Sequence, residues 1–150
     1  MAHMTDWTRL RELAEQRRDH CTMRLADATR QVQDAQRKLQ LLQEYRREYL
    51  SRMGTASRAG IQGAGLRNYQ LFLGNLDRAI EQQGDIVTQV ERERARVQAT
   101  WTSEQRTVHS YGVLHDRQQD HAQSVQRREQ QKLQDEFAAR PLPRFLTGAD

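Results

Sequence analysis

The chain has 150 residues, of which 36% are hydrophobic and 29% charged, and its formal net charge is +4. Apolar residues this sparse cannot fill the core of an ordinary globular domain, but they suffice for a thin seam between two helices. No apolar run approaches the roughly 18 residues that span a bilayer. The single cysteine, Cys21, excludes an internal disulfide framework and fits a reducing compartment. Because acids are interleaved with the arginines, a solvated helix surface is favoured over a nucleic-acid-binding stripe.

The first helix is expected over residues 5–53, after a tag remnant and initiator Met at residues 1–4 that do not resemble a signal peptide. Thr5 or Asp6 can serve as its N-cap. Apolar side chains then recur at alternating steps of three and four, which predicts a heptad seam typical of coiled coils. Equal steps of four through Arg17, Cys21 and Leu25 predict a stutter near the start. The seam positions are Leu25, Ala28, Val32, Ala35, Leu39, Leu42, Arg46, Tyr49 and Met53.

A glycine-rich segment over residues 54–65 is expected to break the helix and reverse the chain. Gly60, Gly63 and Gly65 lie within six residues, with Gly54 shortly before them. Each glycine costs about 1 kcal/mol relative to alanine inside a helix, so the cluster indicates a turn.

The second helix is expected over residues 66–140, before Pro141 and Pro143 end it and residues 141–150 form a disordered tail. Gly74, Gly84 and Gly112 within it predict a flexible helix. Its seam contains several polar residues, whose long side chains can reach water from so thin a core. The seam positions are Tyr69, Leu73, Leu76, Ile80, Gln83, Val87, Val90, Arg94, Val97, Trp101, Glu104, Val108, Tyr111, His115, Gln118, Ala122 and Val125.

The expected fold is all-α, an antiparallel two-helix coiled coil in which the second helix is longer. At 1.5 Å per residue, the helices are about 75 Å and about 110 Å long. Pairing outward from the turn brings Thr5 near His115. The segment Asp116–Arg140, which we call the overhang, is then left without a partner. An isolated helix of this length is marginal in water, so the overhang is expected to fray unless another protein holds it.

Signatures of catalysis are missing from the sequence. No phosphate-binding G-x-x-x-x-G-K-[ST] motif is present, and the G-x-x-G-x-G run at Gly60–Gly65 follows a helix where a dinucleotide fingerprint needs a strand. His109, His115 and His121 are six residues apart, which spreads them around a helix instead of aligning them as metal ligands. We therefore expect no enzyme activity, no catalytic residue, no cofactor and no metal.

More apolar side chains gather near the turn than one seam can bury. Beside the seam lie Leu41, Tyr45, Leu50, Leu71, Phe72 and Ala79. Exposed aromatic patches with a polar rim mark binding sites. Three occupants remain open at this point: a partner protein, a second copy of the chain, or a further element of the same chain.

Four segments, taken in order, give the chain a family resemblance. They are L-x-x-Y-R-x-E-Y at Leu42–Tyr49, N-Y-Q-x-F-x-x-x-L-x-x-A-I-E-Q-Q at Asn68–Gln83, L-x-x-R-Q at Leu114–Gln118 and Q-K-x-x-D-E-F-A-x-R at Gln131–Arg140. Over nearly all of Thr5–Arg140 the chain resembles the FliJ family, small coiled-coil proteins of the bacterial flagellar type III export apparatus.

The resemblance implies a coiled coil similar to the gamma stalk of rotary ATPases. Its terminal end inserts into the hexameric ring of the export ATPase FliI, and the protein also contacts the export gate protein FlhA and unloaded export chaperones. The implied location is cytoplasmic, held at the inner membrane through these partners. The gate-binding residues carried over form what we call the turn-end patch: Leu42, Tyr45, Tyr49, Phe72, Leu76, Ala79 and Gln83. The alternatives are the stalk of a virulence secretion system and a generic coiled-coil adaptor.

Overall fold

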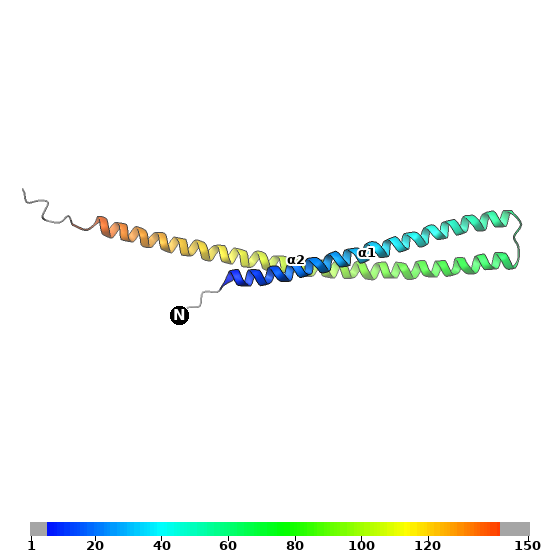
Figure 1. Ribbon diagram of the computed structural model, residues 1–150, viewed down its shortest axis with the longest axis horizontal. Coiled ribbons are helices and arrows are strands. Elements are labelled where there is room, and N and C mark those ends of the chain that lie inside the picture. Colours follow the sequence, from blue (N-terminus) through cyan, green and yellow to red (C-terminus); the bar gives the residue numbers. More distant parts are fainter. Residues whose placement is uncertain (1–5, 142–150) are drawn as a thin grey trace, which may run out of the picture.

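The computed structural model describes residues 6–141, which fold into two long helices. Helix α1 spans Trp7–Arg58 and helix α2 spans Ala64–Ala138. They run antiparallel as a single hairpin and cross over one another at a shallow angle (Figure 1). This confirms the predicted all-α hairpin with a longer second helix. The expected tag remnant, residues 1–4, and all of the expected tail except Pro141 lie outside the described residues.

Helix α1 presents one continuous heptad seam to α2. Asp6 caps the helix, its side chain accepting a hydrogen bond from the backbone N–H of Arg9 at 3.2 Å. The predicted stutter is wrong, because Arg17 is exposed and the half-buried Arg18 occupies the seam in its place. Arg18 Nη1 donates to Gln105 Oε1 at 3.2 Å across the helix pair. The aliphatic stem of an arginine can cover apolar surface while its guanidinium keeps a polar partner. The heptad pattern of α1 therefore continues without a break.

The two helices face each other in opposite order along the whole of α1. As residue numbers rise on α1 they fall by about the same amount on α2, which fixes a single antiparallel register. From the start of α1 towards the turn, the contacting pairs are Trp7–Tyr111, Thr22–Trp101, Ala35–Gln83 and Tyr49–Tyr69. This places the first residues of α1 beside Tyr111, close to the expected position.

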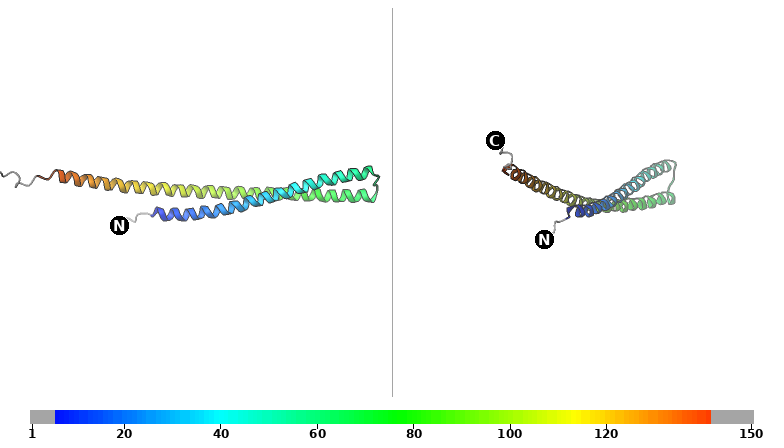
Figure 2. Two further views of the ribbon diagram at one scale, coloured as in Figure 1. Left: turned by 45° about the horizontal axis from the view of Figure 1, so that its top comes forward. Right: turned by 60° about the vertical axis from the view of Figure 1, so that its left-hand side comes forward.

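Packing is tighter towards the start of α1 than at the turn. Four small side chains, Ala14, Cys21, Ala28 and Ala35, are buried at every second seam position of that half. Towards the turn the equivalent positions carry Leu42 and Tyr49, which are only half-buried. The left view in Figure 2 shows α1 crossing over α2 between its start and the turn. A seam made by only two helices covers one side of a large residue, so Leu42 and Tyr49 stay partly exposed.

The turn is shorter than the predicted range 54–65, because α1 continues through Gly54 and α2 begins at Ala64. The break occurs at Gly60, with φ of 97°, where the backbone N–H of Ile61 donates to the carbonyl of Ala56 at 3.1 Å. This is the left-handed glycine ending of a helix, which satisfies carbonyls left free in the last turn. Gly63, with φ of 72°, is the N-cap residue that precedes α2. One glycine costs too little to end a helix whose seam continues, so Gly54 does not break it.

Helix α2 runs unbroken through Gly74, Gly84 and Gly112. Gly112 is buried, and a Cβ at this position would meet the guanidinium carbon of Arg11 at 3.6 Å. That distance is an ordinary van der Waals contact, so Arg11 lies against the helix here and the position has room for an alanine side chain. No helix within residues 6–141 is long and apolar enough to cross a membrane.

Candidate partner-binding surfaces

The turn-end patch brings residues of both helices onto one side of the hairpin. Tyr45 and Tyr49 are one turn apart on α1. The ring centroids of Tyr49 and of Phe72 on α2 are 4.4 Å apart. Ala79 lies two turns after Phe72, so it shares the face of α2 that Phe72 occupies. Tyr45 is 57% exposed and Phe72 is 40% exposed. The carried-over residues therefore include a real aromatic surface.

Other members of the turn-end patch belong to the seam beneath that surface. Leu76 is only 7% exposed, so its side chain packs between the helices and is not presented to a partner. Gln83 is half-buried, and its Nε2 donates to the carbonyl oxygen of Ala35 at 2.9 Å. Leu42 and Ala79 are half-buried. We infer that these four support the surface while Tyr45 and Phe72 present it.

Three exposed side chains near this surface were not among the residues carried over. Leu41 is 57% exposed and lies one turn before Tyr45, while Leu71 is 65% exposed and directly precedes Phe72. Ile86 is 44% exposed and continues the Phe72–Ala79 face by two further turns. The seven-residue spacing from Ala79 to Ile86 was the signal in the sequence that could have found it.

Charged side chains near the turn-end patch interact weakly. Arg46 Nε lies 2.6 Å from Asp77 Oδ1 across the seam, with the two side chains 38% and 51% exposed. An ion pair this exposed contributes about 0–1 kcal/mol to stability. Further along α2, the hydrogen bond from Arg96 holds the pKa of Glu93 below its ordinary value. Because the Arg46–Asp77 ion pair is weak, apolar contact dominates the turn-end patch.

The overhang lies beyond the first residues of α1, where the described part of the chain has no helix that packs beside α2. Seam residues of α2 are buried or half-buried from Tyr69 to Gln118, whereas the next two, Ala122 and Val125, are exposed. Beyond Gln118, Ser124 alone among the described residues is half-buried, and the others are exposed. A shallow, mainly apolar hollow lies here, lined by Gln118, His121, Ala122, Val125, Gln126 and Glu129.

The apolar residues of the overhang leave the heptad pattern after Val125. The following seam positions are Glu129, Lys132 and Glu136, which are charged and exposed. Leu133, 64% exposed, and Phe137, 76% exposed, lie one turn apart instead. A longer α1 would therefore not complete this seam, and the overhang presents an apolar stripe of its own.

Within residues 6–141, no group of three or more His, Cys, Asp or Glu side chains is placed to hold a metal ion. His115 is half-buried in the seam, where its Nδ1 lies 3.5 Å from Asp116 Oδ1, while His109 and His121 are exposed. The histidines are therefore distributed between the seam and the surface.

Comparisons with known proteins identify the family. The model of the flagellar FliJ protein family matches residues 6–144. The chain belongs to this family. A flagellar FliJ protein of Salmonella typhi is 33% identical over 135 residues, which cover 90% of this chain and 92% of the relative. A flagellar FliJ protein of Escherichia coli K12 is 29% identical over the same share of both chains. Membership makes the chain a coiled-coil component of the flagellar export apparatus.

Proposed function

We propose that the protein is a non-enzymatic stalk that connects the export ATPase ring to the export gate. The overhang docks in the hexameric FliI ring, and the exposed part of the turn-end patch contacts the gate protein FlhA. Unloaded export chaperones bind the same rod. These contacts hold the protein in the cytoplasm at the inner membrane, at the base of the flagellum.

The observation that carries this proposal is the unpartnered overhang. It continues a well-packed rod by more than twenty helical residues, yet its apolar side chains face water. Ordering such a segment costs conformational entropy, which a partner that buries the Leu133–Phe137 stripe can offset. A hexameric ring with a central opening offers contacts all round a single helix. The shape of the overhang therefore supports docking in a ring.

The second contact is supported by the aromatic surface at the opposite end. Tyrosine and phenylalanine in a patch with a polar rim are typical anchors of protein interfaces. The overhang and the turn-end patch are separated by most of the paired rod, so both can be occupied at once. A stalk with two separated binding ends suits a role in coupling ATP turnover to export.

The ring contact is tested by Leu133→Asp combined with Phe137→Asp. Burying a carboxylate in an apolar contact is unfavourable, so binding to the purified ATPase should fall by about 30-fold or more, equivalent to about 2 kcal/mol. Leu71→Asp is the matched control, because Leu71 is 65% exposed and Leu133 is 64% exposed, at opposite ends of the rod.

The control should bind the ATPase normally, and both variants should keep the circular dichroism of the parent. Equal loss of ATPase binding in the two variants would contradict docking through the overhang. The flagellar family match favours this apparatus over the virulence secretion system or a generic adaptor.

A further inference from the structure

The last turns of α1 and the first turns of α2, on either side of the chain reversal, carry no carboxylate. Residues 49–76, which we call the tip, contain three arginines and neither aspartate nor glutamate. The net charge of this segment is therefore +3. The nearest acids along the chain are Glu48 and Asp77, and Asp77 is paired with Arg46.

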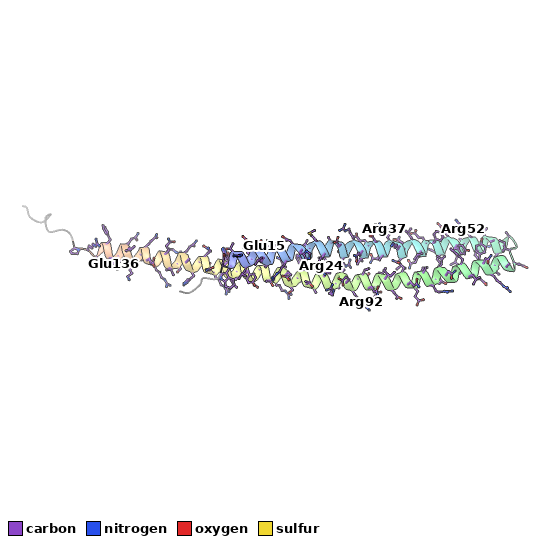
Figure 3. All side chains as sticks on the ribbon, turned by 60° about the horizontal axis from the view of Figure 1, so that its bottom comes forward. Glu15, Arg24, Arg37, Arg52, Arg92 and Glu136 are labelled. Carbon is purple, nitrogen blue, oxygen red and sulfur yellow. The ribbon has the colours of Figure 1, made fainter. Side chains whose placement is uncertain are left out.

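The three arginines of the tip are available to an outside partner. Arg52, Arg58 and Arg67 are all exposed, and none forms an ion pair with another residue in the described range 6–141. Figure 3 shows Arg52 near the turn, at the end of the rod opposite Glu136. Elsewhere on the rod, arginines and acids alternate and partly neutralise one another. The tip therefore carries positive charge with no carboxylate of its own.

Apolar side chains are interleaved with these charges. Ile61, at the chain reversal, is 39% exposed, and Leu71 is 65% exposed one helical turn after Arg67. The turn around Ile61 consists mostly of glycine and alanine. Few large neighbouring side chains therefore prevent Ile61 from contacting a flat surface. Basic residues flanking exposed aliphatic ones are the combination that binds the interface of an anionic bilayer.

We propose that the tip binds directly to the surface of a membrane rich in anionic lipids. The arginines lie at the level of the phosphates, and their stems extend along the bilayer surface. Ile61 and Leu71 enter the boundary between the headgroups and the acyl chains. The rod is then held tip-first, and the overhang points away from the membrane. This contact depends on neither the ATPase ring nor the gate protein.

A membrane fits this surface better than a nucleic acid does. Nucleic-acid binding without sequence preference uses basic side chains together with aromatic rings on which bases stack. Here the ring of Tyr49 packs against those of Tyr69 and Phe72, and the exposed apolar side chains nearest Arg58 and Arg67 are the aliphatic Ile61 and Leu71. Aliphatic side chains gain free energy by leaving water for hydrocarbon.

The test is co-sedimentation of the full chain with lipid vesicles. Vesicles of phosphatidylcholine alone are compared with vesicles in which phosphatidylglycerol replaces part of that lipid. The parent chain should bind only the anionic vesicles, and added salt should weaken binding by screening. Arg58→Gln with Arg67→Gln should lower the partition coefficient by about 30-fold, since each basic residue near the surface contributes about 1 kcal/mol.

The matched control is Arg92→Gln with Arg106→Gln, which removes the same charge from two exposed arginines in the middle of the rod. This control should retain most of the binding to anionic vesicles. For the apolar contribution, Ile61→Ser should weaken binding severalfold, while Leu133→Ser in the overhang should not. Circular dichroism verifies that each variant keeps its helices.

Three results would overturn the proposal. The first is no binding to anionic vesicles. The second is equal loss in the tip variant and its control, which would indicate attraction by overall charge. The third is tip-dependent binding to a DNA duplex without binding to vesicles. A failure of ATPase binding leaves all of these measurements unchanged, so the two proposals are tested separately.

Discussion

Tyr49 connects the seam of the coiled coil to its surface. The centroid of its ring lies 5.1 Å from the ring centroid of Tyr69 and 4.4 Å from that of Phe72, and Tyr49 is half-buried. Aromatic contacts of this kind contribute about 0.5–1.5 kcal/mol beyond the area they bury. Phe72 therefore takes part both in packing and in the exposed patch, whereas Tyr45 lies mainly in solvent.

At the residue scale, Tyr45→Ala combined with Phe72→Ala should separate binding from folding. The double variant should lose roughly 1–3 kcal/mol of stability, because Phe72 gives up both its ring contact with Tyr49 and the area that it buries, while helix content persists. Binding to the gate protein and motility should be lost, since interface aromatics contribute about 2 kcal/mol or more each. Thermal melts by circular dichroism, a gate-binding assay and an ATPase-binding assay are the measurements.

Leu76→Ala serves as the control for core packing. Because Leu76 is 7% exposed, truncating it should cost roughly 2–5 kcal/mol of stability. Severe unfolding of the Tyr45, Phe72 double variant would place those side chains in the core. A stable double variant that still binds the gate would assign the aromatic surface to another partner.

At the element scale, the overhang and the paired part of α2 should differ in amide hydrogen exchange. Seam residues of α2 up to Gln118 are buried or half-buried, whereas those of the overhang beyond Gln118 are exposed. Exchange should therefore be fast across the overhang in the free protein and slow when the ATPase ring is added. The segment around Val97, which is 4% exposed, provides the protected reference. Equal protection of both segments in the isolated chain would contradict this expectation.

The sequence predicted the helices and their register better than their ends. Apolar residues at alternating steps of three and four determine which face is buried, and burial follows that pattern from Ala14 to Gln118. The end of α1 was misplaced because a lone glycine, Gly54, resembles a break although the helix continues through it. The contact between Gly112 and Arg11 across the hairpin gave no local signal in the sequence.

The candidate surface was predictable only in part. Tyr45 and Phe72 are exposed aromatics that flank a heptad, which pattern alone can identify. Pattern alone did not separate Leu76, which is buried, from these neighbours, because the packing of the two helices against each other decides how much of each side chain is covered. Arg18 illustrates the same point in the seam, since an arginine there is stabilised by its hydrogen bond to Gln105.

At the scale of the whole molecule, the protein is a rod whose length is set by α2. With 75 residues in this helix, the longest dimension should be about 110 Å or slightly more. Small-angle scattering should give a distance distribution with a long tail and a mass of 17.6 kDa for a monomer. A compact particle would contradict the hairpin, and twice the mass would indicate that the exposed apolar surfaces pair two copies.

The short connection between α1 and α2 also determines how the chain acquires its structure. Because the helices are sequential and antiparallel, contacts beside the turn close the shortest loops and cost the least entropy. Folding can then proceed like a zipper, with Tyr49–Tyr69 forming early and Trp7–Tyr111 last. During synthesis on the ribosome, the turn-side half is complete while the rest of α2 is still being made. The overhang follows the paired part of α2 in the chain, so α1 can meet its own seam partner before the apolar stripe of the overhang is made.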